Sequence, residues 1–417
     1  MKNKFMLAFA IFALVVTGSK AQKFEGLADT PPMGWNAWNC FNCDRINEKT
    51  IREIADAMVI SGMQCAGYEY IVIDDCWQVG RDENGNIVVD SAKFPSGMKA
   101  LADYIHSKGL KFGIYSDAGR KTCAGRPGSR GYEYQDARTY ASWGVDYLKY
   151  DWCYAEEQSA KADYALMRDA LYKAGRPILF SMCEWGANKP WNWAKDVAHI
   201  WRTTGDIRNN WDAAYTDEGL AWGGGVTIVL DLQQGLERFA GPGGWNDPDM
   251  LFVGNGVLTE EEDRAHFSLW CMLAAPLIAG NDLRNMSETT KQILTNAEVI
   301  DLNQDPLGQQ GYRIKDWGEF EVYCKPLKNG DIAICFFNRY DHAIDVEFNW
   351  ATLNAVIHAD GKELAIHPQL KHKKNFALEG NYKIRDLWKK QFVGSTDQVF
   401  KASIRKHDVV TLRLIKE

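Results

Sequence analysis

Acidic side chains recur in this sequence at the ends of short, β-rich runs. Eight such runs lie between residues 30 and 285, and seven of them end in Asp or Glu. The seven acids are Asp75, Asp117, Asp151, Glu184, Asp206, Asp249 and Asp282. One acid in such a place is often a helix N-cap, but seven that meet at one edge of a sheet would form a carboxylate-rich pocket. Two carboxyl groups that flank one bond can act as proton donor and nucleophile.

The elements that must position these acids alternate between strand and helix patterns. The predicted strands are Pro32–Trp38, Tyr68–Asp75, Lys111–Asp117, Val145–Asp151, Ile178–Glu184, Ile200–Asp206, Gly243–Asp249 and Pro276–Asp282. Several of these runs are largely apolar, as expected for a parallel sheet that is covered on both faces. Helical spacing of apolar residues occurs between them, at Glu48–Met63, Ala100–Ser107 and Ala160–Ala174.

Eight β/α units within about 250 residues predict an α/β fold, a (β/α)8 TIM barrel over residues 22–312. The alternative, a doubly wound sheet, would carry a glycine-rich phosphate loop after its first strand, and none follows Pro32–Trp38. In a barrel the C-terminal strand ends converge on the face that holds the active site.

After about residue 312 the pattern changes to short strands and turns. Strand-like runs occur at Phe320–Lys325, Asp331–Asn338, Ala343–Phe348 and Val409–Ile415. Residues 313–417 are therefore predicted to form a small C-terminal antiparallel β-sandwich with a structural role.

The N-terminus and the net charge limit the location and the partners of the protein. Lys2 and Lys4 precede the apolar stretch Phe5–Val16, and Ser19-Lys20-Ala21 offers small residues for a cleavage site. Residues 1–21 are therefore predicted to be a signal peptide, and the mature protein to be exported, either to a periplasm or out of the cell. Without this segment the net charge changes from −7 to −10, which disfavours a nucleic-acid partner. No later run is long enough to predict a membrane span.

Metal and cofactor motifs are not evident. The sequence contains no HExxH motif, and Cys40-x2-Cys43 is the only spacing that resembles half of a metal knuckle. We therefore expect no metal and no cofactor. An acid-rich barrel mouth suits glycoside hydrolysis, and the 16 Trp offer flat apolar faces on which sugar rings can stack.

Several motifs carry a family resemblance. They are Met33-Gly34-Trp35-Asn36-x-Trp38, Ile73-Asp74-Asp75-Cys76-Trp77, Lys149-Tyr150-Asp151-Trp152-Cys153, Cys183-Glu184-Trp185, Gly241–Met250 (GPGGWNDPDM) and Asn303–Gly308 (NQDPLG). In order and in sequence, from about residue 27 to 315, they resemble glycoside hydrolase family 27, the α-galactosidase (melibiase) family. The resemblance implies a retaining exo-α-galactosidase that acts on terminal α-D-galactosyl residues of oligosaccharides or polysaccharides.

The resemblance also implies roles for two carboxylates. Asp151 would be the nucleophile, and Asp206, four residues after Arg202, the acid/base, with Asp212 as the alternative. Lys149 lies two residues before Asp151 on the same strand, so it would face the same side and help to keep that carboxylate ionised. A neighbouring carboxylate and partial burial would raise the pKa of Asp206, as proton donation requires.

The residues implied to contact the sugar come from several strand ends. Trp38 would be the stacking platform, and Asp74 and Asp75 would accept hydrogen bonds from the O4 and O6 side of galactose. The complete implied set is Trp38, Asp74, Asp75, Tyr115, Cys123, Lys149, Cys153, Glu184, Trp185, Arg202 and Asp249.

Two related activities, α-N-acetylgalactosaminidase and β-L-arabinopyranosidase, remain alternatives. Glu184 would crowd an N-acetyl group and could bond a free 2-hydroxyl, although the nearby Ala187 weakens this argument. The acidic pair Asp74 and Asp75 near C6 again favours galactose. A galactose-binding protein without activity and a metal-dependent hydrolase that uses the same acids are further alternatives. The sequence does not indicate the natural galactoside or the oligomeric state.

The ten Cys are expected to differ in state. The resemblance implies the disulfides Cys43–Cys76 and Cys123–Cys153. Cys183 is expected to be a buried thiol, because Ala198 stands where some relatives carry its partner. Cys324 and Cys335 are equidistant from the Asn329-Gly330 turn and are candidates for a bridge across a hairpin. The pairing of the others, Cys40, Cys65 and Cys271, stays open.

Overall fold

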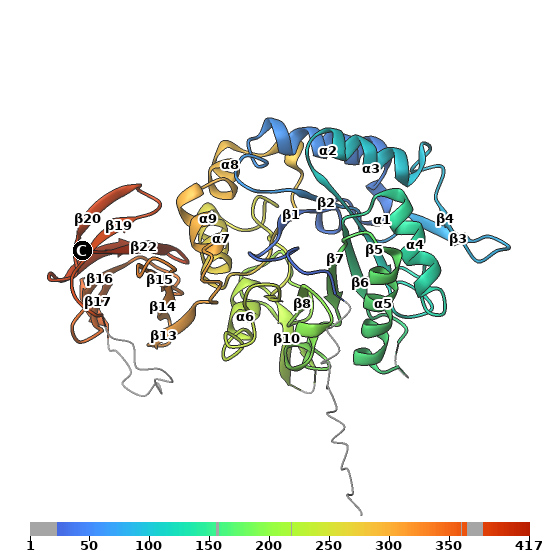
Figure 1. Cartoon of the computed structure of the whole chain (residues 1–417). Helices are drawn as coiled ribbons and strands as arrows, with labels where there is room; N and C mark the ends of the chain where they lie inside the picture. The colour runs from blue at the N-terminus through green and yellow to red at the C-terminus, as the bar shows by residue number, and fades with distance from the viewer. Residues whose placement is uncertain (1–22, 156–157, 218, 360, 365–377) are drawn as a thin grey trace, which may run out of the picture.

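Figure 1 shows the computed structural model of the chain, in which residues 23–155, 158–217, 219–359, 361–364 and 378–417 are described. The expected signal peptide, residues 1–21, lies outside the described residues. Eight short strands form one sheet in the N-terminal part. They are β1 (Met33–Asn36), β2 (Tyr70–Val72), β5 (Lys111–Asp117), β6 (Tyr147–Asp151), β7 (Leu179–Cys183), β8 (Ile200–Arg202), β11 (Trp245–Asp247) and β12 (Leu277–Ala279).

The sheet is parallel throughout, in the order β11-β8-β7-β6-β5-β2-β1-β12. A parallel bridge between Leu251 and Ala279 joins the segment after β11 to β12, and the Leu251 amide donates to the Ile278 carbonyl at 2.8 Å. This contact closes the sheet into a (β/α)8 barrel. Each of the eight predicted runs contains one of these strands, so the barrel prediction is confirmed.

Helices connect the strands and surround the barrel (Figure 1). They are α1 (Trp38–Arg45), α2 (Glu48–Ile60), α3 (Gly97–Ser107), α4 (Glu133–Trp143), α5 (Ala160–Ala174), α6 (Val226–Asp231), α7 (Glu260–Met272), α8 (Glu288–Leu294) and α9 (Ala297–Asn303), with the 3-10 turns η1 (Pro190–Asn192), η2 (Ala194–Asp196) and η3 (Leu283–Asn285). Local sequence explains their ends. The Asn47 side chain accepts a hydrogen bond from the Thr50 amide at the start of α2. Gly175, with a φ of 81°, ends α5 in the left-handed region that glycine adopts without strain.

The inside of the barrel changes from apolar to polar along the strands. On β6, Tyr147, Lys149 and Asp151 alternate with Leu148 and Tyr150, so the two sets face opposite sides of the sheet. Leu148 and Tyr150 pack in the large core that includes the helices. Tyr147 belongs to a separate cluster with Ala28, Tyr70, Val72, Leu179, Ile200, Trp245 and Ala274. Lys149 and Asp151 therefore continue this inner face toward the C-terminal strand ends.

Two antiparallel hairpins, which the sequence did not indicate, interrupt the β/α alternation. The first is formed by β3 (Gln78–Arg81) and β4 (Ile87–Val89), and the second by β9 (Ala214–Asp217) and β10 (Leu220–Gly224). The second hairpin lies between β8 and α6, in the loop that follows Asp206.

The C-terminal part is an antiparallel β-sandwich, drawn in orange and red in Figure 1. One sheet contains β13 (Tyr312–Asp316), β14 (Phe320–Pro326), β15 (Ile332–Asn338), β22 (Val409–Lys416), β19 (Tyr382–Asp386) and β20 (Gln391–Ser395), in this order. The other contains β18 (Lys362–Leu364), β17 (Asn354–Ala359), β16 (Ile344–Asn349) and β21 (Phe400–Ile404). Aromatic side chains fill the space between them, with Phe336 in contact with Phe348, Trp350 and Phe400. The predicted fold of this part is confirmed.

Helix α7 joins the two parts. It packs against β14, β15 and β22 of the sandwich, and Arg264 of α7 donates from Nε to Asp408 at 2.9 Å. Farther along the interface, the His407 ring stacks on Trp211 of the barrel loops, with 4.9 Å between centroids.

The proposed bridge between Cys324 and Cys335 is wrong. In the β14–β15 pair, Cys324 lies opposite Ile334 and Cys335 lies opposite Tyr323. Because neighbouring strand residues point to opposite faces, Cys324 enters the core of the sandwich while Cys335 faces the core shared with the barrel. The two sulfurs therefore cannot meet.

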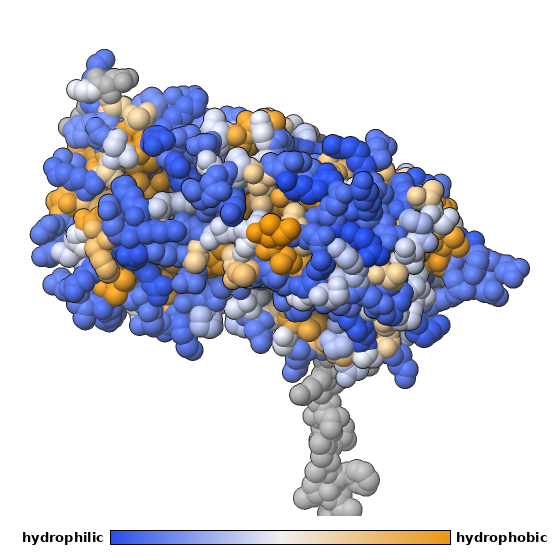
Figure 2. All heavy atoms as spheres, turned by 90° about the horizontal axis from the view of Figure 1, so that it is seen from above, coloured by the Kyte–Doolittle hydropathy of each residue, from blue (hydrophilic) through white to orange (hydrophobic). Residues whose placement is uncertain are grey.

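The surface is mostly polar. Among the described residues, no helix combines the length and the apolar character needed to cross a membrane. Figure 2 shows a largely hydrophilic face on which hydrophobic residues lie in small separate groups. Exceptions to a polar surface include Leu220 and Trp222 of β10, which are 76% and 46% exposed.

Candidate active site

A cavity lies at the C-terminal end of the barrel strands. Its lining contains five acids, three cationic side chains, three Trp and a disulfide. The lining residues are Trp38, Asn39, Asp74, Asp75, Tyr115, Cys123, Lys149, Asp151, Cys153, Trp185, Arg202, Asp206, Ile207, Arg208, Trp222, Asp249 and Met250. Every residue that the sequence indicated for catalysis or sugar contact lies here except Glu184 and Asp212, the alternative acid/base. Asn39, Ile207, Arg208, Trp222 and Met250 were not indicated.

Asp151 ends β6 and is almost fully buried, with 5% of its surface exposed. Its Oδ1 accepts a hydrogen bond from the Trp152 amide and its Oδ2 accepts one from the Tyr115 hydroxyl, both at 3.0 Å. Burial raises the pKa of Asp151 to about 6, with Lys149 acting to lower the pKa and Asp206 acting to raise it. Lys149 thus acts in the expected direction, but burial outweighs it.

Asp206 follows β8 and is more open, with 43% of its side chain exposed. Arg202 Nη2 lies 3.2 Å from Asp206 Oδ1, and Arg208 Nη2 lies 3.9 Å from Asp206 Oδ2. Burial acts to raise the pKa of Asp206, but the positive charges of Arg202, Lys149 and Arg208 outweigh it and keep the pKa below its ordinary value. The expectation of a raised pKa is therefore wrong for the free enzyme, because these three cations outweigh burial and the neighbouring carboxylate.

Asp74 and Asp75 both line the cavity although they are neighbours in sequence. Both can face the cavity because the regular strand β2 ends before them, at Val72, and the chain turns at Cys76, whose φ is 75°. Asp74 Oδ2 accepts hydrogen bonds from Lys149 Nζ and Asn36 Nδ2, each at 2.8 Å.

Asp75 is held by backbone amides. Its Oδ1 accepts from the Cys76 amide at 2.7 Å and its Oδ2 accepts from the Ala124 amide at 2.9 Å. Burial raises the pKa of Asp75, and the hydrogen bond from the Ala124 amide acts to lower it. This acid is therefore fixed in place before any ligand binds.

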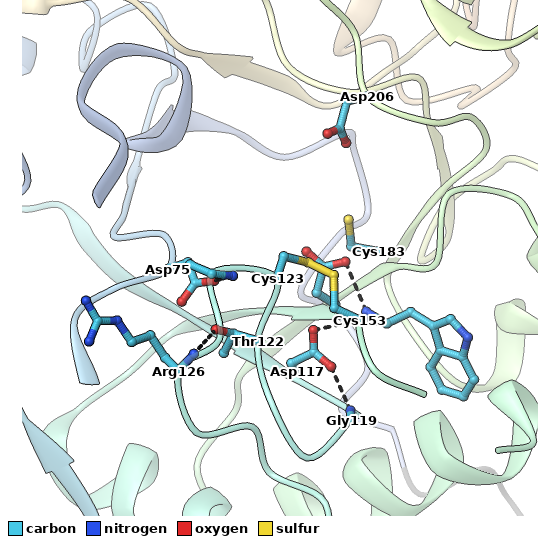
Figure 3. Close-up of a disulfide and its surroundings, with 12 residues drawn as sticks. Asp75, Asp117, Gly119, Thr122, Cys123, Arg126, Cys153, Cys183 and Asp206 are labelled. Carbon is cyan, nitrogen blue, oxygen red and sulfur yellow. Dashed lines mark hydrogen bonds between the residues drawn. A yellow bond between two sulfur atoms is a disulfide. The ribbon is translucent and has the colours of Figure 1, made fainter. Parts of the chain in front are cut away.

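Both predicted disulfides are present, Cys43–Cys76 and Cys123–Cys153. Cys123 precedes Ala124, and Cys153 lies two residues after Asp151, so the second bridge ties the loop that holds Asp75 to the strand end that holds Asp151. In the view of Figure 3 this bridge lies between Asp117 and Asp206.

The cysteines outside these two bridges differ in their burial. Cys183 is a buried thiol, as expected, and Arg202 Nη1 donates to its sulfur at 3.5 Å. Cys40, Cys65, Cys271 and Cys335 are also outside disulfides.

Asp249 and Arg202 form a buried ion pair with 3.0 Å between Nη2 and Oδ2. Asp249 has a φ of 78°, and the amides of Ile207 and Met250 donate to its carboxylate at 2.9 and 2.8 Å. A non-glycine residue in this region is strained, and such residues concentrate at functional sites. Trp185, with a φ of 58°, is a second case in the cavity wall.

Glu184 lies beside the cavity and is not part of its lining. Its Oε2 accepts hydrogen bonds from the Asn188 amide and the Asn188 side chain, at 2.7 and 2.8 Å. Burial raises the pKa of Glu184 to about 7. The next residue, Trp185, lines the cavity in its place.

In the described part of the chain, one group of side chains has its potential metal-binding atoms close enough together to hold an ion. It consists of Asp117, Cys123, Asp151 and Cys153, whose ligand atoms lie within 4.8 Å of one another. Cys123 and Cys153 are joined in a disulfide, and the thiolate is the form that binds metals. The donor set therefore does not suit a metal ion.

The arrangement of the cavity suits chemistry that uses two carboxyl groups. A buried acid and a half-exposed acid share one cavity, and fixed acids and cations surround them. This combination suits the cleavage of a glycosidic bond.

Comparisons with known proteins agree with this chemistry. A family model described as alpha galactosidase A matches residues 30–305, and a model described as alpha galactosidase C-terminal beta sandwich domain matches residues 318–414. Alpha-galactosidase A of Cellvibrio japonicus is 55% identical over 417 residues, which covers 99% of both chains.

Solved structures agree in fold. Alpha-galactosidase I from Mortierella vinacea has a TM-score of 0.85 at 37% identity, covering 94% of this chain and 98% of its own. The alpha-galactosidase of Saccharomyces cerevisiae, solved with raffinose, has a TM-score of 0.85 at 30% identity, covering 96% of this chain and 100% of its own. The chain therefore belongs to glycoside hydrolase family 27, the α-galactosidase family.

Proposed function

We propose that the protein is a retaining exo-α-galactosidase in which Asp151 is the nucleophile and Asp206 the acid/base. The observation that carries the proposal is that these two carboxylates line one cavity together with fixed polar groups suited to sugar hydroxyls. The full-length similarity to an alpha-galactosidase and the raffinose-bound relative support the substrate class.

In the first half-reaction, a carboxylate oxygen of Asp151 attacks the anomeric carbon of galactose. The bond from that carbon to the leaving oxygen breaks, and the proton of Asp206 moves to the leaving oxygen. The product is a galactosyl ester on Asp151. The Tyr115 hydroxyl, which donates to Asp151 Oδ2 at 3.0 Å, orients the attacking carboxylate.

In the second half-reaction, Asp206 is a base. It takes a proton from water, the water oxygen attacks the anomeric carbon, and the ester bond to Asp151 breaks. Galactose leaves with its α configuration intact, and both carboxyl groups return to their first state. The cations that lower the pKa of Asp206 also stabilise its ionised form, which is the form that this half-reaction requires.

Asp74 and Asp75 are the acceptors that we assign to the hydroxyls on the O4 and O6 side. Lys149 and Asn36 hold Asp74, and backbone amides hold Asp75, so both acids are oriented in advance. Trp38 offers an apolar face for the C–H side of the ring. Tyr115, Cys123, Lys149, Cys153, Trp185, Arg202 and Asp249 complete the proposed contacts.

Galactose remains the preferred sugar, but Glu184 contributes less to that choice than the sequence suggested. Asn188 engages Oε2 of its carboxylate, and Glu184 is not part of the cavity lining. The preference for galactose over β-L-arabinopyranose, which has no hydroxymethyl group, rests on the acidic pair Asp74 and Asp75. Rates on the nitrophenyl α-galactoside, α-N-acetylgalactosaminide and β-L-arabinopyranoside test it, and a faster rate on either rival would reject galactose.

The location and the division of the chain are part of the proposal. We propose that residues 1–21 direct export and are removed, that residues 22–312 carry catalysis, and that residues 313–417 support the barrel. Two disulfides support an oxidising compartment, where such bonds persist.

Two measurements test the mechanism directly. Proton NMR of the first product released from a nitrophenyl α-galactoside should show α-galactose before mutarotation, and initial β-galactose would reject retention. In Asp151→Ala, added azide should restore turnover and yield a β-galactosyl azide, because the small anion replaces the missing nucleophile from the same side. Asp163→Ala, which changes an acid on the outer helix α5, is the matched control and should keep wild-type activity.

A further inference from the structure

An aromatic surface stands at the rim of the cavity on the hairpin β9–β10. Trp222 lines the cavity and is 46% exposed. Its ring lies against Tyr215 of the opposite strand, with 5.8 Å between centroids and 33° between planes. The Arg208 guanidinium lies 5.2 Å from the Tyr215 centroid. We call Arg208, Tyr215 and Trp222 the hairpin platform.

The hairpin platform is attached to the residue next to Asp206. The Gly205 amide donates to the Trp222 carbonyl at 2.7 Å, and the Gly224 amide donates to the Asp206 carbonyl at 3.2 Å. A Cβ atom at Gly205 would lie 2.0 Å from Trp222 Cε3, so the indole ring packs directly on the Gly205 backbone. The absence of a side chain at this position is what lets the ring reach the wall beside Asp206.

The position of the hairpin platform relative to Asp206 determines which part of a substrate it can contact. The group that protonates the leaving oxygen must lie beside it, so the leaving group extends past Asp206. The galactose side of the cavity is built from buried groups such as Asp74, Asp75 and Asp151. The platform is half-exposed and lies on the Asp206 side, where the rest of a saccharide would leave the cavity.

We propose that the hairpin platform binds the leaving-group sugar, a hexopyranose ring, and so forms the specificity-determining subsite next to galactose. The C–H face of the ring stacks on Trp222, whose ring lies against Tyr215. Arg208 has five N–H donors and no acceptor, and its side chain is half-exposed, so it donates to hydroxyls of that ring. This inference rests on the proposed function, because it takes Asp206 as the proton donor.

The test compares a substrate that has this ring with one that lacks it. Melibiose carries a glucose leaving group, whereas methyl α-galactoside carries only a methyl group. In Trp222→Ala, the ratio of kcat/KM for melibiose to kcat/KM for methyl α-galactoside should fall about tenfold, the factor expected for one lost stacking contact. Trp222→Phe should restore most of the ratio.

A matched control comes from the sandwich. Phe392 of β20 is a comparably exposed aromatic residue, at 58%, and lies on the sandwich rather than at the cavity. Phe392→Ala should leave the ratio at the wild-type value. Equal losses on both substrates in Trp222→Ala would overturn the proposal, because they would mean that Trp222 acts only through Asp206. An unchanged ratio would overturn it as well.

A binding measurement separates this inference from the proposed function. In Asp151→Asn, calorimetry should give a melibiose Kd that Trp222→Ala weakens about tenfold, and a galactose Kd that it weakens far less. If the wild-type protein hydrolyses neither substrate while this difference in Kd remains, the proposed function fails and the platform stands. If hydrolysis is normal and the difference is missing, the platform is rejected.

Discussion

Lys149 and Asp74 form a buried ion pair at the barrel mouth, with 2.8 Å between Nζ and Oδ2. Burial acts to lower the pKa of Lys149, but Asp74 and neighbouring groups, Asp151 among them, raise it well above its ordinary value, so the lysine stays charged. One cation therefore fixes an acid assigned to sugar binding and also moderates the nucleophile on the same strand.

Removing that cation should damage both functions. In Lys149→Met, Asp74 loses its ionic partner in a buried place, so kcat/KM on nitrophenyl α-galactoside should fall about 100-fold and the free energy of unfolding by about 3 kcal/mol. Lys111→Met is the control, because its pair with Glu69 is exposed and should be worth less than about 1 kcal/mol. Similar effects in both variants would contradict the role assigned to Lys149.

Activity should have an acidic optimum. The two carboxyl groups titrate as a pair, and the pKa of about 6 at Asp151 lies above its ordinary value, so one proton stays on the pair below pH 6. Catalysis needs one proton on the pair, hence kcat/KM should decline as the pH rises through about 6.

The same profile in Lys149→Met should move to higher pH, because Lys149 acts to lower the pKa of Asp151. A plateau that extends to pH 8 in the wild type would contradict this assignment, and so would an unchanged limb in the variant.

Ionisation of Asp151 should lower the free energy of unfolding. Its pKa is about 6 in the folded protein against 3.8 ordinarily. Protonation of Asp151 therefore favours the folded state at low pH, and this contribution to the free energy of unfolding is lost as the pH rises through 6. Asp151→Asn should therefore raise the free energy of unfolding by about 1–3 kcal/mol at pH 7. Urea titrations at pH 7 and pH 4 check this, since the gain should nearly vanish at pH 4.

The disulfide Cys123–Cys153 should matter for both stability and activity. The double variant Cys123→Ser/Cys153→Ser should lose about 2–4 kcal/mol of unfolding free energy. It should also bind galactose more weakly, because the Ala124 amide that holds Asp75 adjoins Cys123. Thermal unfolding and galactose titration measure the two effects. Cys65→Ser, at an exposed thiol, should change neither.

The sequence predicted the barrel and most of the site for identifiable physical reasons. Runs such as Lys111–Asp117 are buried on both faces, and the largely apolar stretch Phe112–Tyr115 precedes the acid at the end of this run. Asp74, Asp151 and Asp249 stood in long motifs, so their place at the barrel mouth followed from the family resemblance together with the strand pattern.

Other features depend on contacts that no local pattern encodes. The β9–β10 hairpin has a glycine-rich second strand, Leu220–Gly224, which gives no alternation. The course of the chain at Trp185, with its positive φ, separates Glu184 from the cavity. The pKa of Asp206 depends on Lys149, which approaches from β6, as well as on Arg202 of the strand that precedes it.

Helix α7 has a consequence for how the molecule responds to heat or denaturant. One of its sides lies in the barrel core, and another contacts the sandwich strands β14, β15 and β22. Unfolding of either part would remove the packing on one side of this helix, so the enzyme should denature in a single cooperative transition. For the same reason, severing the polypeptide near residue 312 should yield fragments that aggregate.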